Sequence, residues 1–144
     1  MDIAIVGATG NVGRKTLEVL QQKNFNINNL YLVASPNSAG KQLEFNGKKY
    51  SIDNLETYDF SKAKITFFAA GGKISKQYAE KAAKHTTVID NSSYFRMDPD
   101  VPLIVPQVNA KDIQNMKKNI IANPNCSTAQ LVLVLSLIHI SEPT

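Results

Sequence analysis

The first residues of the chain join an apolar run, a glycine-rich turn and an amphipathic segment. Residues 3–6 are all apolar, and Gly7, Gly10 and Gly13 follow them at a spacing of three. Beyond the turn, apolar side chains recur at helical spacing as far as Leu20. Glycine permits a tight turn and a close approach to the backbone, and a helix N-terminus offers N–H groups to a phosphate. The opening therefore predicts a strand, a turn and a helix that bind a pyrophosphate.

The rest of the chain alternates strand-like and helix-like segments. The pattern predicts strands near residues 2–6, 30–34, 65–70, 86–90 and 119–122, and helices near residues 11–22, 74–84 and 109–117. This alternation is typical of a parallel sheet that is covered by helices on both faces. We therefore expect an α/β fold of the Rossmann type, with a doubly wound, mostly parallel sheet. Residues 35–58 lack a long helical pattern and predict short strands or an irregular crossover.

Loops of small residues follow several of the predicted strands, at residues 34–40, 69–72 and 90–93. Ligands of open parallel sheets bind outside the carboxyl ends of the strands, so these loops should converge on one crevice. The glycine spacing differs from the strict G-x-G-x-x-G fingerprint, and a purely structural turn is therefore the alternative.

The end of the second predicted strand bears on the choice of cofactor. Enzymes that select NAD usually place a carboxylate about 20 residues beyond the glycine turn, where it binds the ribose 2′-hydroxyl. Residues 33–38 contain no carboxylate, and their hydroxyl and amide groups precede Lys41. The sequence therefore favours NADP over NAD. The alternative is that residues 35–37 form a turn for local reasons alone.

Cys126 is the only cysteine of the chain and lies between a strand-like and a helix-like run. Ser127 and Gln130 have the spacing of a capping box, which predicts a helix that begins just after the cysteine. Backbone N–H groups at that helix N-terminus would favour the thiolate. Cys126 is therefore a candidate nucleophile, and the alternative is an inert, buried cysteine.

Composition limits the remaining function classes. The net charge of +4 comes with scattered lysines, so Lys48, Lys49, Lys117 and Lys118 are expected at the surface and no nucleic-acid partner is expected. A mean hydropathy of -0.19 argues against a membrane protein. A single cysteine excludes an internal disulfide, and residue 2 starts a strand where a signal peptide would need an apolar stretch. These features predict one cytoplasmic domain.

Five motifs in order resemble aspartate-semialdehyde dehydrogenases of the bacterial type, over about residues 1–135. They are residues 7–13, residues 34–35 with 38–40, residues 90–96, residues 105–109 and residues 124–128. The resemblance implies NADP-dependent, phosphate-requiring interconversion of aspartate semialdehyde and aspartyl phosphate. It also implies a place on the path to lysine, threonine and methionine, and a homodimer or homotetramer at full length.

The resemblance also implies roles for individual residues. Cys126 would attack the aldehyde, Arg96 would bind substrate or phosphate, and Asn125 would contact the substrate. No metal is implied. The positions that match nucleotide-binding residues are Gly7, Thr9, Gly10, Asn11, Val12, Gly13, Ser35, Asn37, Ser38 and Gly72.

The chain departs from the family pattern at three places. Asn37 stands where arginine is common, which leaves the choice between NADP and NAD open, and Gln107 stands where glutamate is usual. Residues 136–144 resemble a translated sequencing adapter, and we expect them to be non-native. The expected organisation is a nucleotide-binding domain at residues 1–125 and the start of a catalytic domain at residues 126–135.

The resemblance includes only the start of the family's catalytic domain, and this bears on the activity that we expect. The family's acid/base histidine and its substrate-orienting glutamine lie downstream of the cysteine. His85 is expected at an exposed helix end, and His139 lies in the tail, so neither is assigned as a base. We therefore expect these 144 residues to be inactive by themselves.

Two other functions stay open at this point. A reductase of N-acetyl-gamma-glutamyl phosphate shares the cysteine chemistry, but its typical His-Pro-Gly-Cys pattern differs from residues 123–126. A non-catalytic dinucleotide-binding module, in which Cys126 is merely packed, is the alternative from a different class.

Overall fold

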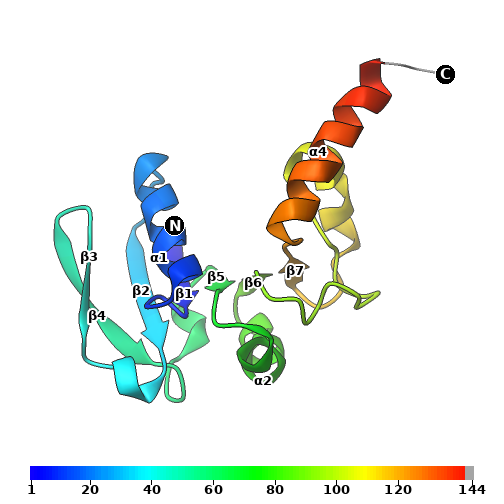
Figure 1. Cartoon of the computed structure of the whole chain (residues 1–144). Helices are drawn as coiled ribbons and strands as arrows, with labels where there is room; N and C mark the ends of the chain where they lie inside the picture. The colour runs from blue at the N-terminus through cyan, green and yellow to red at the C-terminus, as the bar shows by residue number, and fades with distance from the viewer. Residues whose placement is uncertain (142–144) are drawn as a thin grey trace.

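The computed structural model describes the backbone of residues 1–141 and the side chains of residues 1–138. These residues form a seven-stranded sheet with the order β3-β4-β2-β1-β5-β6-β7 (Figure 1). The strands are β1 (Asp2–Val6), β2 (Asn29–Ala34), β3 (Gln42–Phe45), β4 (Lys48–Asn54), β5 (Ile65–Phe68), β6 (Thr87–Asp90) and β7 (Ile120–Ala122). After β1, the strands β2, β4 and β3 lie on one side of β1, and β5, β6 and β7 lie on the other side. The topological switch point is therefore between β1 and β5.

Four α-helices and three 3-10 turns accompany the sheet in the described residues. The helices are α1 (Asn11–Gln22), α2 (Gly72–Ala83), α3 (Pro106–Asn109) and α4 (Cys126–Ser141), and the turns are η1 (Pro36–Ser38), η2 (Phe60–Lys62) and η3 (Ala110–Asn115). The helices α1 and α2 lie on opposite faces of the sheet (Figure 1).

The alternation of side chains along β1 explains the two cores. Ile5 packs in the apolar cluster that includes Leu17 of α1. Val6 points the other way and packs in the cluster that includes Ala79 of α2. Successive side chains of a strand point to opposite faces, so a continuous apolar run such as β1 is stable only between two layers.

The sheet is mostly parallel, as predicted, and the one antiparallel pair among the described strands lies at its β3 edge. β3 pairs antiparallel with β4, and β4 pairs parallel with β2. The hairpin turn places Asn46 at a φ of 50° and Gly47 at a φ of 73°, a combination that Asn-Gly adopts readily. The prediction of short strands between residues 35 and 58 is therefore confirmed.

Most of the predicted elements are confirmed to within two residues, but the predicted helix at 109–117 is wrong. That segment contains the end of the four-residue helix α3 and the 3-10 turn η3. Residues 110–115 are all exposed. A segment without an apolar face to bury gains little from tertiary packing, which supplies most of the stability of a helix.

The expectation that helices cover both faces holds only in part. The strand register places Phe67, Ile89 and Ile121 in line with Ile5, on the face that α1 covers. Unlike Ile5, these three side chains are only half-buried. Phe67 of β5 packs against the cluster that includes Leu17 of α1. Ile89 of β6 and Ile121 of β7 belong to neither apolar cluster of the described residues. The other face of the same strands is covered by α2.

The helix α4 extends away from the sheet and lies beside α3 (Figure 1). It has no polar face, and its large apolar side chains from Leu131 to Ile138 include several that are more than half exposed. Residues 136–141, in the expected non-native tail, continue this helix, and residues 142–144 lie outside the described residues. No described helix is long and apolar enough to cross a membrane.

Candidate functional site

A cavity of about 380 Å³ opens at the carboxyl ends of β1, β2 and β5, where the switch point predicts a ligand site. Three of the predicted nucleotide contacts on the glycine turn line it, together with Ser35 after β2. The lining residues are Val6, Gly7, Thr9, Gly10, Ala34, Ser35, Leu55, Ala69, Ala70 and Ile74. The glycine turn, the loop after β2 and the loop after β5 therefore converge on one crevice.

The glycines of the turn have different physical roles. Gly7 has a φ of 85°, and a Cβ there would lie 2.8 Å from the Ala69 carbonyl. A Cβ at Gly13 would lie 2.3 Å from the Gly7 oxygen, so Gly13 allows α1 to pack on the turn. At Gly10, a Cβ would meet only the Gly7 oxygen at 3.4 Å. Gly10 is thus the one of these three glycines at which an added methyl group would have room.

The N-terminus of α1 adds donors to this edge of the cavity. Gly10 is the N-cap residue and caps without a side chain, and the helical ladder begins with the Arg14 N–H, which donates to the Gly10 carbonyl at 2.9 Å. The N–H groups of residues 11–13 precede that first bond. Such free donors and the helix dipole suit a phosphate.

The other predicted nucleotide contacts lie around this cavity rather than in its lining. Asn11 and Val12 are exposed in the first turn of α1. Asn37 and Ser38 lie in η1, directly after Ser35, and Gly72 begins α2. Residues 35–41 contain no carboxylate. The assignment of these positions as cofactor contacts stays a prediction.

A second group of polar residues follows the neighbouring strands β6 and β7. The Arg96 Nε–H donates to the Asn123 carbonyl at 3.0 Å, and Arg96 Nη2 donates to the Asn91 carbonyl at 3.1 Å. No ion pair holds Arg96 among the described residues. A surface salt bridge therefore does not account for the position of Arg96 in this part of the chain.

The loop that carries Arg96 is anchored by a buried carboxylate that sequence reasoning did not single out. Asp90 is fully buried and accepts hydrogen bonds from Ser75 Oγ at 2.7 Å, from the Ser92 N–H at 3.1 Å and from Ser92 Oγ at 2.6 Å. Ser75 belongs to α2, so Asp90 ties this helix to the loop. A carboxylate at the end of an otherwise apolar strand was the available signal, because buried charges need such partners.

Cys126 is the first residue of α4 and is exposed. Its thiol donates to Asn125 Oδ1 at 3.8 Å, and the same oxygen accepts the Ser127 N–H at 2.9 Å. The helix is therefore capped by Asn125, and the prediction of a Ser127 cap is wrong by two positions. Asn125 takes the role because its short side chain reaches back over the first turn. Cys126 is not buried, and its role as a nucleophile stays a prediction.

The two histidines and the potential metal ligands complete the set of residues considered from the sequence. His85 follows α2 and is exposed, as expected, while the side chain of His139 lies outside the described residues. No group of three or more potential metal ligands of the His, Cys, Asp or Glu type is found in the described part of the chain.

Residues 2–116 match the family described as "Semialdehyde dehydrogenase, NAD binding domain". The chain belongs to the semialdehyde dehydrogenase family. The matched region contains the glycine turn, the cavity and the Arg96 loop, and Cys126 follows it within ten residues. The fold class predicted from the sequence is therefore confirmed, and a nicotinamide dinucleotide is the cofactor class of this domain.

Similar curated relatives are named aspartate-semialdehyde dehydrogenases. The protein from Aquifex aeolicus is 53% identical over 140 residues, which are 95% of this chain and 41% of the relative. Aspartate-semialdehyde dehydrogenase 2 from Vibrio cholerae is 48% identical over 140 residues, 96% of this chain and 42% of the relative. The chain thus spans about two fifths of the length of these relatives.

Solved structures give the same relationship. Aspartate semialdehyde dehydrogenase II from Vibrio cholerae, complexed with ASA, aligns with a TM-score of 0.92 at 48% identity, over 95% of this chain and 45% of that one. Aspartate semialdehyde dehydrogenase with NADP from Candida albicans aligns with a TM-score of 0.77 at 25% identity, over 96% of this chain and 47% of that one.

Proposed function

We propose that this chain is the cofactor-binding and nucleophile-bearing part of an NADP-dependent aspartate-semialdehyde dehydrogenase. The observation that carries the proposal is the bond from Arg96 to the Asn123 carbonyl. It joins a guanidinium that has no acidic partner among the described residues to the loop that leads into Cys126. The similarity to aspartate-semialdehyde dehydrogenases, one of them solved with ASA, supports the choice of substrate.

The cofactor-binding part is the crevice at the glycine turn. Thr9, Gly10 and Ser35 line it, and the first turn of α1 offers N–H groups to the pyrophosphate. The absence of a carboxylate from residues 35–41, and Lys41 at the end of that segment, suit the 2′-phosphate of NADP. We include Gly7, Gly13 and the surrounding positions in this site, namely Asn11, Val12, Asn37, Ser38 and Gly72.

Cys126 performs the covalent step. Its thiolate attacks the aldehyde carbon of aspartate semialdehyde and forms a C–S bond, and the carbonyl oxygen takes up a proton. When bound, NADP supplies the hydride acceptor that converts this hemithioacetal to a thioester, with release of that proton. An oxygen of inorganic phosphate then forms a bond to the thioester carbon, the C–S bond breaks, and Cys126 leaves as thiolate from aspartyl phosphate. Covalent catalysis divides one difficult step into easier ones.

Arg96 and Asn125 bind the reacting groups. A guanidinium has five N–H donors, of which Arg96 uses one on Nε and one on Nη2 for the two carbonyls. The remaining donors suit the oxygens of a phosphate or carboxylate. Asn125 is adjacent to the thiol, and its amide group can contact the substrate as well as cap α4.

The place of the protein in the cell follows from this reaction. The reaction in the reverse direction would supply aspartate semialdehyde for the synthesis of lysine, threonine and methionine in the cytoplasm. We propose a homodimer or homotetramer as the working form at full length. The 144 residues by themselves should be inactive, because the one contact to the thiol in the described residues is an amide oxygen, which cannot act as a base.

The cofactor part is tested by calorimetric titration of the 144-residue chain with NADP and with NAD. We expect NADP to bind more tightly, and tighter binding of NAD would overturn the choice of cofactor. An assay of phosphate-dependent NADPH formation from aspartate semialdehyde should show no turnover by this chain. Turnover comparable to that of a full-length relative would overturn the proposed inactivity.

The Arg96 part is tested by Arg96→Lys. Inorganic phosphate, titrated by NMR through the side-chain signals of residue 96, should bind about tenfold more weakly to the variant, because an ammonium group cannot reproduce two parallel bonds. The affinity for NADP should be unchanged. Equal loss of both affinities would instead indicate a role of Arg96 in folding.

A further inference from the structure

The orientation of Arg96 depends on two loops at once. Its Nε–H bonds the carbonyl of Asn123, which follows β7, and its Nη2 bonds the carbonyl of Asn91, which follows β6. Phe95, the residue before it, is buried and fixes the backbone at that point. The direction of the free guanidinium donors is therefore set by the distance and angle between the two loops.

The main-chain ladder between those loops ends just at this point. β6 and β7 are parallel, with Asp90 opposite Ala122, so Asn91 and Asn123 are the next residues of each strand. The Asn123 N–H donates to the Asp90 carbonyl at 2.8 Å as the last bond of the ladder. Residue 124 is proline and has no N–H to continue it.

A side-chain bridge continues the connection beyond the ladder. Asn123 Nδ2 donates to Asn91 Oδ1 at 2.8 Å. The Asn91 amide is itself oriented, because both its backbone N–H and its Nδ2 donate to the Phe68 carbonyl, at 3.0 and 3.3 Å. Rotation of the Asn91 amide would therefore cost its bond to β5, and the acceptor stays directed at Asn123.

We infer that the Asn91–Asn123 bridge positions Arg96 together with the Asn125–Cys126 segment, so that anion binding at Arg96 depends on Asn123. This inference rests on the proposed role of Arg96 in binding phosphate. Asn123 is a positioning residue, because it touches Arg96 and Asn91 rather than a reacting group. The bridge keeps the loop of the anion-binding arginine and the loop of the nucleophile in one arrangement.

The experiment measures anion affinity in the 144-residue chain with inorganic sulfate as the probe, followed by NMR through the Arg96 Nε–H signal. Asn123→Ala removes the bridge but keeps the carbonyl that accepts from Arg96. We expect sulfate to bind about two- to tenfold more weakly, which corresponds to one hydrogen bond. NADP affinity, measured in parallel, should stay unchanged.

Asn119, at the opposite end of β7, provides the matched control. Its amide donates to the Ala83 and Thr86 carbonyls and accepts from Thr87 Oγ1. Because its φ is 54°, Asn119→Gly removes these bonds without adding backbone strain. This variant should lower the melting temperature at least as much as Asn123→Ala and leave sulfate affinity unchanged. Equal weakening of sulfate binding in both variants would overturn the inference, since a general loss of stability would then explain it.

A double-mutant cycle tests the bridge itself. Asn91→Ala should weaken sulfate binding as Asn123→Ala does, and the double variant should be no weaker than either one, because all three lack the same bond. Additive losses, or wild-type affinity of Asn123→Ala, would overturn the inference. Failure of the unaltered chain to bind sulfate would overturn the proposed anion site of Arg96, and the inference with it.

Discussion

Substitutions at neighbouring positions of this chain should affect different properties, either folding or ligand binding. Around the glycine turn, Gly13 packs against the Gly7 carbonyl, whereas Gly10 has open space beside it. Substitutions at these two glycines therefore separate folding from cofactor binding, although both glycines belong to one motif. Tyr58 is a position of another kind, because its buried hydroxyl has no hydrogen-bond partner among the described residues.

Gly13→Ala should strongly destabilise the fold, whereas Gly10→Ala should not. A Cβ at Gly13 would lie 2.3 Å from the Gly7 carbonyl oxygen, a backbone atom that cannot move aside easily, at a cost of about 3 kcal/mol in the free energy of unfolding. At Gly10, the added methyl group should leave the melting temperature nearly unchanged and weaken NADP and NAD alike, by about tenfold, because it occupies space at the pyrophosphate. Thermal unfolding and calorimetric titration measure the two effects. Unchanged cofactor affinity of Gly10→Ala would contradict the placement of the pyrophosphate.

Tyr58→Phe should stabilise the chain. The Tyr58 hydroxyl is buried and has no hydrogen-bond partner among the described residues, and burial raises the pKa of Tyr58 far above its ordinary value. The ring packs edge-on against Phe60, with centroids 5.2 Å apart, and phenylalanine keeps this contact. Removal of the unpaired hydroxyl should raise the free energy of unfolding by about 1 kcal/mol in urea denaturation. A destabilised variant would show that the hydroxyl has a partner in solution.

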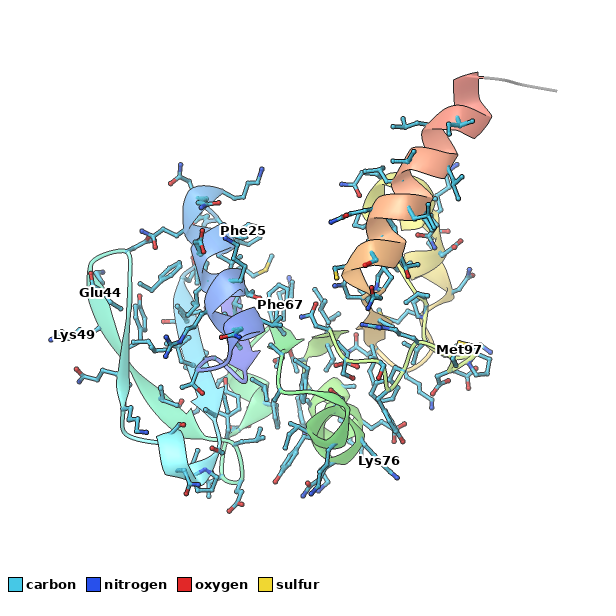
Figure 2. All side chains as sticks on the ribbon, in the orientation of Figure 1. Phe25, Glu44, Lys49, Phe67, Lys76 and Met97 are labelled. Atoms are coloured by element: carbon cyan, nitrogen blue, oxygen red, sulfur yellow. The ribbon has the colours of Figure 1, made fainter. Side chains whose placement is uncertain are left out.

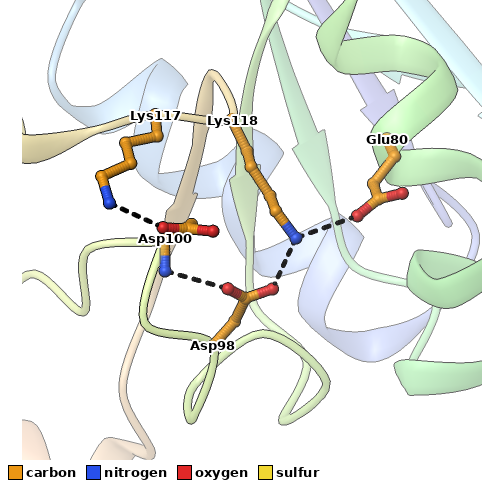
Figure 3. A network of polar contacts seen from close by, with 5 residues as sticks. All are labelled: Glu80, Asp98, Asp100, Lys117 and Lys118. Carbon is orange, nitrogen blue, oxygen red and sulfur yellow. Dashed lines mark hydrogen bonds and ion pairs between the residues drawn. The ribbon is translucent and has the colours of Figure 1, made fainter.

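At the scale of elements, an ion network ties the loop after β6 to α2 and to the start of β7 (Figure 3). Lys118 contacts Asp98 at 2.9 Å and Glu80 of α2 at 3.3 Å, and Lys117 contacts Asp100 at 2.8 Å. Asp98 also accepts the Asp100 N–H at 2.9 Å. The network lies at the end of the strands opposite the cavity, so we expect it to affect stability and to leave the site unchanged.

Asp98→Asn should lower stability in a pH-dependent way. The hydrogen bond from Lys118, followed by that from the Asp100 N–H, lowers the pKa of Asp98 in the folded chain. A lowered pKa adds stability that is complete above the unfolded value of about 3.9 and is lost as the pH falls through the folded value. The difference in melting temperature between variant and wild type should therefore be present at neutral pH and shrink in acid below about pH 4. Added salt should reduce this difference in melting temperature at neutral pH. A difference that grows in acid would contradict a stabilising role of the ion network.

The whole molecule leaves two apolar surfaces open among its described residues. One is the half-buried pair Ile89 and Ile121 on the face of β6 and β7, beyond Phe67, which packs against the α1 cluster. The other is α4, which is apolar all round. Figure 2 shows Phe67 beside α1 and Met97 on the loop at the far side, where its side chain is also exposed. A helix of this composition is normally buried.

The 144-residue chain should self-associate through α4. Leu131, Val134 and Leu137 are 60%, 54% and 60% exposed, and contiguous apolar surface without a partner favours association. Size-exclusion chromatography should show a species larger than the 15.8 kDa monomer, at a proportion that rises with concentration. Leu131→Lys combined with Val134→Glu should restore the monomer, and a chain without residues 136–144 should associate less. A clean monomer of the unaltered chain would refute this prediction.

The sequence by itself determined the features that depend on neighbouring residues. The apolar run of β1, the glycines at spacing three and the helical periodicity as far as Leu20 define a strand, turn and helix locally, and the alternation of such units defines a parallel sheet. The start of a helix beside Cys126 was also predictable from the spacing of Ser127 and Gln130, whereas the exposure of the thiol was not. The capping residue of α4 could not be predicted, because the choice between Asn125 and Ser127 depends on where the backbone first becomes helical.

Only the tertiary structure decided which distant residues meet at the candidate site. Arg96 bonds a carbonyl 27 residues away, Asn91 and Asn123 are separated by 32 residues, and Ser75 reaches the buried Asp90 from another element. Hydrogen bonds of this kind depend on strand order and register, which no local periodicity encodes. The partly exposed face of β6 and β7 has the same origin, because an apolar strand pattern predicts that a face must be covered but does not specify which segment covers it.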